Sequence, residues 1–257
     1  MSAVGNGFRI LDAVVDGGGD GLSFAAIVEA TGLPKATVHR LLKELVALAA
    51  LTHDPASRRY RAGMRLARLG AHVLSDFDLR KTVHPHLAAL HEETGHVATL
   101  GILERDTGVY VDKIEPRDFG IRLHSEIGKH FPLHCTAMGK MLLAGLDPAT
   151  RERLLARHLD AYTDNTVTDR RALLAELNAI GRRGYAIDNE EITRGLICVA
   201  APVIDHDGRT RGAMSCTFPR YLKDERGIDA EIDAVVRHSA AASGLATQAS
   251  TRPDRGA

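Results

Sequence analysis

The stretch TGLPKATVHRLLKELVAL, residues 31–48, limits the possible folds of this chain more than any other segment. Its apolar residues recur at the i, i+3, i+4, i+7, i+8 spacing of a helix with one buried face. These residues are Val38, Leu41, Leu42, Leu45 and Val46. The opposite side of the same helix carries Ala36, Arg40, Lys43 and Ala47. The stretch therefore predicts a half-buried helix whose outer face is small and basic.

The residues before this helix predict a second helix joined to it by a tight turn. Ser23 can cap that preceding helix, with Leu22 and Ile27 at the two apolar positions that flank such a cap. Gly32 is placed to end it, and Pro34 suits the first turn of the following helix. Two helices joined in this way have the layout of a helix-turn-helix, whose second helix lies in the major groove of DNA.

A shorter helix is expected before this pair, and a β-hairpin after it. The apolar residues of the first helix are Phe8, Leu11, Val14 and Val15, and the glycine-rich segment DGGGDG ends it. In LAALTHDPASRRYRAG, the turn signal DPAS separates two stretches that can pair, which places Arg58, Arg59 and Arg61 on or beside the hairpin tip. Three helices followed by a basic hairpin predict a winged helix-turn-helix.

The distribution of charge favours DNA as the partner of this module. The whole chain of 257 residues has 33 Lys and Arg against 33 Asp and Glu, so its net charge identifies no partner. Between Pro34 and Arg68, however, basic residues dominate, and only Glu44 and Asp54 are acidic. The alternative is a basic face that is merely solvated, but the tight turn and the arginine-bearing hairpin favour binding to duplex DNA. The residues expected at the DNA are Ser23, Lys35, Ala36, Thr37, Arg40, Lys43, Arg58 and Arg59.

Cysteine usage and the absence of an apolar leader predict the compartment. Cys135, Cys198 and Cys216 are odd in number and show no paired spacing, which argues against a disulfide framework and for a reducing environment. No apolar run reaches the length needed to span a membrane. We therefore expect a cytoplasmic protein with no membrane partner, and the sequence indicates no cofactor.

The sequence resembles the IclR family of bacterial transcriptional regulators from about Phe8 to Leu245. The motifs that carry the resemblance are LSFAAIVEATGLPKATVHRLLKEL, YRAGMRLARLG, GKHFPLHCTAMGKMLLA, RRGYAIDNEEITRGLICVAAPV and GAMSCTFP. Pro34 departs from the pattern, because many members place a helix-capping serine there. The resemblance implies an α+β chain with these parts: a winged helix-turn-helix over residues 1–63, a linker helix over 64–80, a GAF-like α+β effector-binding domain over 81–247, and a disordered tail over 248–257.

The patterns in the second half agree with that architecture. Leu66, Leu69 and Val73 form a helical stripe suited to a linker or dimer contact. Helices are expected over VHPHLAALHEETG, from about Thr136, over DRRALLAELNAIGRRG, and from about Asp224 to Leu245. Strands are expected over HVATLGIL and GVYVDKI, and LICVAAPVIDHDGRTRGAMSCTF predicts a hairpin with DHDG at its turn.

The strand that ends in GAMSCTF predicts a polar cavity in this second domain. Alternate residues are apolar and can enter a core, whereas Ser215 and Thr217 share the other face, which lines a cavity or meets water. Amide groups at the helix start near Thr136 favour an anion, so these parts fit a small carboxylate. Asp188 can accept a hydroxyl of such a ligand, which favours hydroxy or sugar acids. From the resemblance, the effector pocket is lined by Gly128, Lys129, Asp188, Leu196, Cys198, Ser215 and Thr217.

Three alternatives to a ligand-responsive regulator are an enzyme, a metal-binding protein and an architectural DNA binder. Cys198 or Cys135 could be an enzyme nucleophile with His134 as its base, but no local signature of such an enzyme is present. The histidines His84, His86 and His91 share one expected helix without the spacing of a zinc site. A purely architectural DNA binder would have little use for a second domain with a polar pocket.

The expected function is therefore regulation of a catabolic operon by a protein that binds operator DNA and senses a small organic acid, either a sugar acid or an acid derived from aromatic compounds. Because one recognition helix reads few base pairs, a homodimer is expected at minimum. The resemblance adds a dimer of dimers. The operator, the effector and the direction of regulation stay open.

Overall fold

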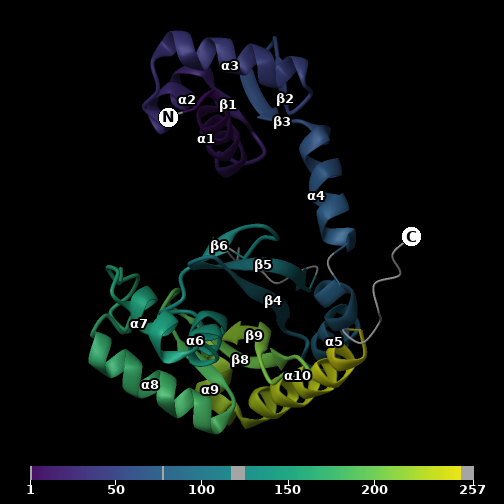
Figure 1. Ribbon diagram of the computed structural model, residues 1–257, viewed down its shortest axis with the longest axis vertical. Coiled ribbons are helices and arrows are strands. Elements are labelled where there is room, and N and C mark those ends of the chain that lie inside the picture. The colour runs from purple at the N-terminus through teal and green to yellow at the C-terminus, as the bar shows by residue number, and fades with distance from the viewer. Residues whose placement is uncertain (1, 77, 117–124, 250–257) are drawn as a thin grey trace. The chain divides into compact units, whose positions relative to one another are not determined.

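The structure is a computed structural model that describes residues 2–76, 78–116 and 125–249 of the chain. It forms two compact units, Met1–Asp76 and Phe77–Ala257 (Figure 1). The boundary between the units falls within the segment 64–80 that the sequence analysis assigns to a linker helix. The domain borders given above stay a prediction.

The first unit is a winged helix-turn-helix, as the sequence predicts. Its helices are α1 (Ala3–Asp16), α2 (Phe24–Thr31) and α3 (Lys35–Ala47), and α4 (Met64–Asp76) follows them. A three-stranded antiparallel sheet has the order β1-β3-β2, with β1 at Leu22–Ser23, β2 at Leu51–Asp54 and β3 at Arg59–Ala62. The helices pack around a core that includes Ile10, Ile27, Val38, Leu42 and Leu51.

The turn between α2 and α3 follows the expected chemistry with one difference. The hydroxyl of Ser23 accepts a hydrogen bond from the amide of Ala26 at 3.3 Å and so caps α2. Gly32 ends α2 in the left-handed conformation, with φ at 62°. Pro34 is the N-cap of α3 rather than a first-turn residue, so the helix begins one position later than predicted and has no side-chain cap.

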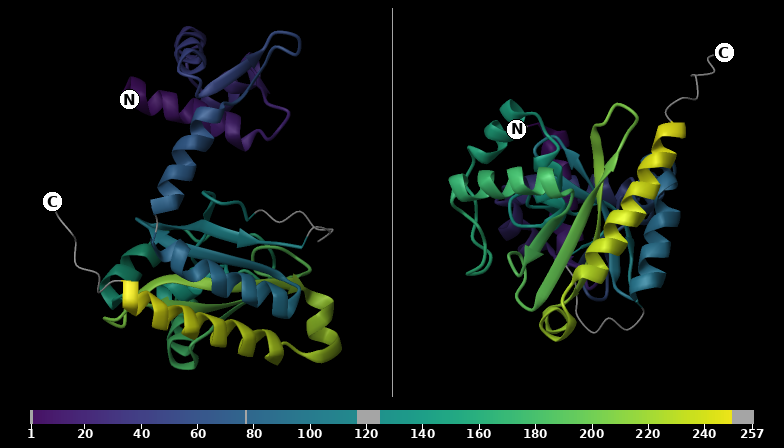
Figure 2. Two further views of the ribbon diagram at one scale, coloured as in Figure 1. Left: turned by 90° about the vertical axis from the view of Figure 1, so that its right-hand side faces the viewer. Right: turned by 90° about the horizontal axis from the view of Figure 1, so that it is seen from below.

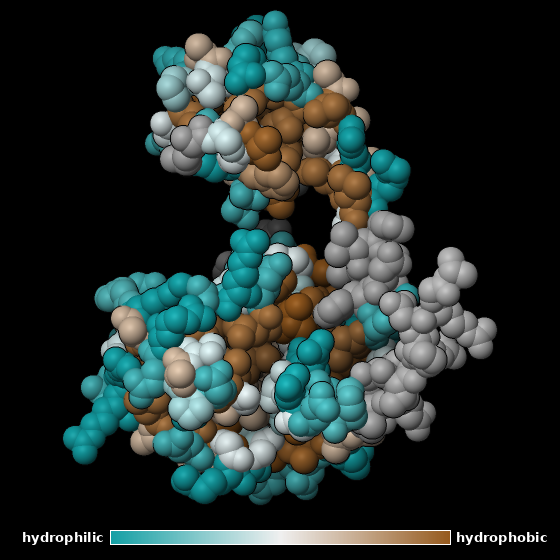
Figure 3. Space-filling model, viewed as in Figure 1, coloured by the Kyte–Doolittle hydropathy of each residue, from teal (hydrophilic) through white to brown (hydrophobic). Residues whose placement is uncertain are grey.

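The apolar face of α1 differs from the sequence prediction. Of the four predicted residues, Val14 enters the core and the half-buried Leu11 packs against it, whereas Phe8 is 61% and Val15 is 55% exposed. Ile10, which the prediction did not include, is fully buried. Phe8 and Val15 share the outer side with Val4, at helical spacing on a second stripe. The helix has two apolar stripes, and periodicity alone does not reveal which one the domain buries. Figure 3 shows apolar surface exposed on this amino-terminal unit.

The second unit is an α+β domain built on one six-stranded antiparallel sheet. The strand order is β6-β5-β4-β9-β8-β7. The strands are β4 (Val97–Glu104), β5 (Thr107–Ile114), β6 (His130–Phe131), β7 (Ala186–Asn189), β8 (Leu196–Ile204) and β9 (Thr210–Pro219). The helices are α5 (Asp78–Thr94), α6 (Ala137–Ala144), α7 (Pro148–Leu155), α8 (Arg170–Arg183), α9 (Arg220–Arg226) and α10 (Asp229–Ala249).

Helices cover both faces of this sheet (Figure 2). The helices α5 and α10 pack on one face, against Met214, Cys216 and Phe218 of β9, which the sequence places on an apolar face. The helices α6 and α8 pack on the other face, where Ala200 and Ala213 are buried. Because both faces are covered, Ser215 is fully buried, and the alternative in which it faces water is wrong.

The last helix, predicted to be continuous from Asp224 to Leu245, is two helices in the structure. Gly227, with φ at 75°, separates α9 from α10. The predicted tail begins too early, because residues 248 and 249 end α10, and residues 250–257 lie outside the described residues. The three cysteines are free thiols. Within the described ranges, no helix has the length and apolar character needed to cross a membrane.

Candidate DNA-binding face and effector cavity

The outer face of α3 is the one that the sequence predicts. Lys35, Ala36, Arg40 and Lys43 are exposed, and Thr37 is half-buried. On the opposite side, the apolar residues Val38, Leu41 and Leu42 are buried. His39 is a further exposed side chain on this helix, and the prediction missed it. His39 is three residues from Ala36 and four from Lys35 and Lys43, and this helical spacing indicates that it shares their face.

Arg40 forms an ion pair within α3. Its guanidinium lies 2.7 Å from the carboxylate of Glu44, and both side chains are more than half exposed. Such surface pairs contribute only about 0–1 kcal/mol. The pair can therefore open when a phosphate or a base edge approaches, so it does not remove Arg40 from the candidate DNA contacts.

The wing is held by its own turn. The carboxylate of Asp54 accepts hydrogen bonds from the amide of Ala56 at 2.9 Å and the hydroxyl of Ser57 at 2.6 Å. The Ser57 and Ala56 hydrogen bonds hold the pKa of Asp54 below its usual value. Arg58 follows at the tip, exposed and with φ at 54°. Arg59 instead donates to the carbonyl oxygen of Gly21 at 2.7 Å and so fastens the wing to the segment before β1.

A small polar cavity of about 80 Å³ lies in the second unit, between the sheet and the start of α6. Five of the seven predicted effector residues line it: Asp188, Leu196, Cys198, Ser215 and Thr217. The lining residues that the sequence analysis did not name as pocket residues are Thr99, Tyr110, Ser125, Thr136, Ala137, Met138, Ile192 and Thr193. A cavity of this volume holds several water molecules, so it suits a small ligand.

Strand register brings the cavity residues together. Cys198 on β8 pairs with Asp188 on β7 and with Thr217 on β9, so these three side chains form one row across the sheet. Thr99 and Ser215 pair in the same way on β4 and β9. The hydroxyl oxygens of Thr99 and Ser215 lie 2.6 Å apart, and the hydroxyl of Thr217 lies 3.2 Å from the sulfur of Cys198.

Gly128 and Lys129 do not line this cavity, and both are exposed. The amide of Gly128 donates to the carbonyl of Tyr110 at 2.7 Å, and the amide of Tyr110 donates to the carbonyl of Lys129 at 3.1 Å. The amide of Lys129 donates to the carbonyl of Glu126 at 3.0 Å. In this structure these two residues therefore hold the strand that carries Tyr110, and their amides are already used.

The first turn of α6 lies in the wall of the cavity. Ala137 and Met138 line the cavity, and first-turn amides have no partner within their own helix. Thr136 caps the helix by accepting from the amide of Gly139 at 3.0 Å, and its own hydroxyl donates to the carbonyl of Pro132 at 2.8 Å. The start of a helix in a cavity wall favours an anionic group there.

Ser125 is a second donor without a partner. Its side-chain oxygen is buried, has no hydrogen-bond partner, and lies in the cavity wall; the residue is only 9% exposed. A buried hydroxyl without a partner costs about 1–3 kcal/mol. A ligand that accepts a hydrogen bond from Ser125 removes that cost.

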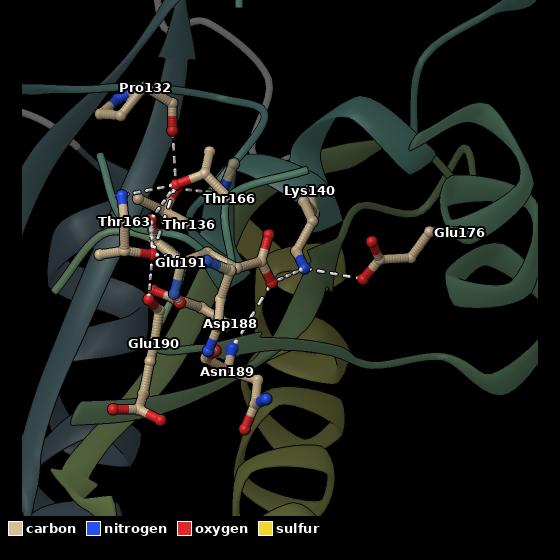
Figure 4. A network of polar contacts seen from close by, with 12 residues as sticks. Pro132, Thr136, Lys140, Thr163, Thr166, Glu176, Asp188, Asn189, Glu190 and Glu191 are labelled. Carbon is tan, nitrogen blue, oxygen red and sulfur yellow. Dashed lines mark hydrogen bonds and ion pairs between the residues drawn. The ribbon is translucent and has the colours of Figure 1, made fainter. Parts of the chain in front are cut away.

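Behind the cavity lies a buried cluster of charges (Figure 4). The ammonium group of Lys140 on α6 is fully buried, 2.5 Å from the carboxylate of Glu191 and 2.7 Å from that of Glu176. The amide of Glu191 donates to the carboxyl group of Asp188 at 2.7 Å. Burial raises the pKa of Asp188 to about 7 although this amide lowers it, and burial also raises the pKa of Glu191 against the effect of Lys140.

Two threonines hold the loop that carries Glu191. The hydroxyl of Thr163 donates to the carbonyl of Glu190, and that of Thr166 donates to the carbonyl of Glu191, each at 2.6 Å (Figure 4). None of the sequence patterns described above predicts this cluster. The one sequence feature that indicates it is Lys140, a single charge within the apolar helix AMGKMLLA.

The surroundings of the cysteines and histidines offer little to an enzyme or metal site. Burial raises the pKa of Cys198 to about 12 and raises that of Cys135 as well, whereas a nucleophilic cysteine needs a lowered pKa. His134 contacts the carbonyl of Asp160 at 2.9 Å. His84 pairs with Asp112, and His91 contacts the carbonyl of His96. The described residues bring together no group of three or more ligands suited to a metal ion.

A winged helix-turn-helix joined to a GAF-like α+β domain with a small polar cavity defines the class of DNA-binding transcriptional regulators. Residues 3–55 match the family model of the IclR helix-turn-helix domain, and residues 71–243 match that of the bacterial transcriptional regulator IclR C-terminal domain. The chain belongs to the IclR family and is a DNA-binding transcriptional regulator of that type.

Curated relatives and solved structures agree with this assignment. The chain is 38% identical over 213 residues to the probable transcriptional regulator SauR of Cupriavidus necator, which covers 82% of this chain and 84% of that protein. It is 37% identical over 195 residues to the HTH-type transcriptional regulator XynR of Escherichia coli, covering 76% and 77%. A crystal structure of an IclR transcriptional regulator from Alicyclobacillus acidocaldarius superposes with a TM-score of 0.83 at 28% identity, over 95% of this chain and 98% of that one.

Proposed function

We propose that this regulator responds to a small organic acid bound in the cavity of the second unit, and that it controls a catabolic operon. The observation that carries the proposal is that Ala137 and Met138, the first residues of α6, line the same cavity as the unpartnered hydroxyl of Ser125. We infer that a carboxylate accepts hydrogen bonds from Ser125 and from the first-turn amides of α6. The hydroxyl groups on the sheet side then suit a hydroxy or sugar acid, and the apolar wall residues Met138 and Leu196 suit an acid derived from an aromatic compound.

The regulation follows from a difference in affinity. The acid must bind one arrangement of the DNA-binding domains better than another, because a ligand indifferent to both shifts no equilibrium. No enzymatic step is required of this domain. A protein that binds chromosomal DNA in a bacterium acts in the cytoplasm, and we place it there.

The DNA contacts are proposed on the exposed face of α3 and on the wing. Thr37, Arg40 and Lys43 meet base edges and phosphates, and Arg58 contacts the backbone from the wing tip. Lys35 and Ala36 at the start of α3 complete this face, with Ser23 at the start of α2. Arg59 has a structural contact to Gly21, so a contact from Arg59 to DNA requires that hydrogen bond to be shared or broken.

A homodimer, or a dimer of dimers, is proposed as the form that binds the operator. The outer stripe of α1 leaves Phe8 and Val15 exposed, and Leu69 on α4 is 50% exposed. Leu66 is half-buried, and the side chain of Val73 lies outside the described residues. Burial of these apolar side chains against a second copy would stabilise paired recognition helices. Sedimentation at micromolar concentration tests this; a monomer that binds its operator singly would contradict it.

The effector proposal is tested by a thermal-shift screen of small acids on the full chain. An acid at 100 times its dissociation constant adds about 2.7 kcal/mol of stability. Ser215→Ala and Thr217→Val should each reduce that gain, whereas Thr168→Val, at an exposed threonine of the same unit, should leave it unchanged. If neutral or cationic compounds stabilise the protein and no acid does, the acid proposal is wrong.

A further inference from the structure

The cavity contains one carboxyl group and no described basic side chain. Asp188 is the acidic residue in its wall, and none of the lysines, arginines and histidines that the structure describes lines it. Asp188 is only 3% exposed. An anionic ligand in this cavity would therefore meet a buried carboxyl group without a cation beside it.

The titratable thiol and phenol groups around Asp188 carry no charge. The cysteines Cys198 on β8 and Cys135 before α6 keep their protons, because burial raises the pKa of each thiol. Tyr110 on β5 is likewise neutral, since burial raises its pKa. The charge of Lys140 on α6 acts on Asp188, but Glu176 on α8 and Glu191 after β7 already pair with it.

The cluster therefore carries three carboxyl groups and one ammonium group. The side chain of Glu176 is 26% exposed, so water screens its charge. If Asp188 and Glu191 were both ionised, the buried part of the cluster would hold two carboxylates against the one ammonium group of Lys140, which leaves one negative charge in excess. A ligand carboxylate would add another, and like charges in a buried site disfavour one another's ionised form. The charge that can be removed most easily is that of Asp188, which lies at the cavity itself.

We propose that the cavity binds its carboxylic acid together with one proton, which is held on the carboxyl group of Asp188. The proposal rests on the acid-sensing function argued above. One proton from solvent joins the ionised carboxyl group as the ligand anion enters, and no covalent bond within the ligand changes. The neutral carboxyl group then donates a hydrogen bond to an oxygen of the ligand, whereas an ionised one only accepts.

The sign of the pH dependence follows. Before the ligand binds, Asp188 has a pKa of about 7, so it is largely neutral at pH 6 and largely ionised at pH 8. The ligand anion raises that pKa further. Small carboxylic acids are ionised throughout this range, so their own titration adds nothing. Since only the neutral form is competent, the affinity is full near pH 6 and falls as pH rises through about 7, by about tenfold between pH 6 and pH 8.

The experiment is isothermal titration of the full chain with glycolate, lactate and glycerate, chosen because the cavity is small. Each acid is titrated at pH 6, 7 and 8, in two buffers of different ionisation enthalpy, which counts the protons taken up on binding. The expected result is affinity about tenfold weaker at pH 8 than at pH 6, with uptake of about half a proton at pH 7 and nearly one at pH 8.

Two variants sharpen the test. Asp188→Asn keeps an oxygen for the amide of Glu191 but cannot ionise, so it should bind the same acids with no proton uptake and no decline to pH 8. Asp233→Asn, at an exposed aspartate of the same unit, should behave as the wild type. If Asp188→Asn does not fold, the number of protons that the wild type takes up on binding still tests whether binding is coupled to a proton.

Two outcomes overturn the proposal, and they are distinguishable. An affinity that is constant or rises with pH, without proton uptake, means that the ligand meets an ionised Asp188 through a hydroxyl; acid sensing then survives and proton coupling does not. Failure of all three acids to bind at pH 6, where Asp188 is neutral, overturns proton-coupled binding in this cavity, whereas the acid-sensing function is decided separately by the thermal-shift screen.

Discussion

Thr99 on β4 and Ser215 on β9 face each other across the floor of the cavity, with their hydroxyl oxygens 2.6 Å apart. Both residues are buried. The hydroxyl of Thr99 also donates to the sulfur of Met138 at 3.6 Å, so Ser215 is the donor within the pair and Thr99 the acceptor. Ser215 therefore depends on Thr99 for its acceptor, and Thr99 depends on Ser215 for its oxygen partner.

Removal of both members of this pair should cost less than the sum of the two single removals. Ser215→Ala leaves the buried hydroxyl of Thr99 without its oxygen partner, so we expect a loss of about 1–3 kcal/mol in the free energy of unfolding. Thr99→Val in the same chain removes the orphaned group. The double variant should then be less destabilised than the sum of the two single variants, as measured by urea denaturation. Strict additivity would show that the two hydroxyls do not depend on one another.

The sequence predicts the cavity best where alternation along one strand decides which side chains share a face. Ser215 and Thr217 were identified in this way, because their neighbours Met214, Cys216 and Phe218 had to enter the core. Likewise, local signals correctly placed the start of α6, the turn between α2 and α3, and the helical spacing of α3. Each of these features depends on residues close together in the sequence.

The rest of the cavity depends on pairings between distant segments. Thr99 reaches Ser215, and Asp188 reaches Cys198, only through the register of the six-stranded sheet. No sequence pattern marks Ser125 as a cavity residue, because its proposed role depends on a buried hydroxyl that has no hydrogen-bond partner in the folded protein. Lys140 was missed because a lysine is almost never fully buried unless it is paired, and its partners come from other elements.

Lys140 should be essential to the stability of the second unit. Lys140→Met leaves the buried carboxylate of Glu191 without its cation, for which we expect a cost of about 3–5 kcal/mol. Lys140→Met combined with Glu191→Gln should recover part of that loss, because no uncompensated charge remains. Chemical denaturation of both variants checks this. If the double variant is as unstable as Lys140→Met alone, the ion pair is not the cause.

The same variant should acquire a pH dependence with a defined sign. Burial already raises the pKa of Glu191, and Lys140 opposes that rise. Lys140→Met removes the opposing charge, so the folded pKa rises further above the unfolded value. A carboxyl group of this kind stabilises the fold less as pH rises through its folded pKa. Relative to the wild type, Lys140→Met should thus lose stability as pH rises from the ordinary pKa of a glutamate, about 4.5, through the raised folded pKa of Glu191. The added Glu191→Gln should reduce that loss, and the remainder belongs to Asp188, whose raised pKa Lys140 also opposes.

Arg40 and Lys43 should differ in how they contribute to operator binding. A base contact is worth about 1–3 kcal/mol, so Arg40→Ala should weaken operator binding about 5- to 150-fold. If Lys43 contacts phosphate, Lys43→Ala should weaken specific and non-specific DNA alike and reduce the salt slope by about one. Glu44→Gln releases Arg40 from its ion pair and should not weaken binding. Normal operator affinity of Arg40→Ala in a gel-shift titration would remove Arg40 from the interface.

Gly108 should be intolerant of even a methyl group. A Cβ atom there would lie 2.1 Å from the ring of Phe131, which β6 places directly opposite. The centroid of that ring lies 4.6 Å from the centroid of the Tyr110 ring, and Tyr110 lines the cavity. Gly108→Ala should therefore push Phe131 against Tyr110, with a cost of about 1–3 kcal/mol and weaker binding of the acid.

A matched pair of variants separates this clash from a general effect of replacing glycine. Gly70→Ala lies in α4 with nothing within 4 Å of the added carbon, so it should stabilise its helix by about 0.5–1 kcal/mol. Phe131→Leu shortens the obstructing side chain, and in the Gly108→Ala background it should raise the thermal midpoint and restore part of the acid binding. Should Phe131→Leu lower the stability of Gly108→Ala as much as it lowers that of the wild type, the clash with the ring is not what Gly108 avoids.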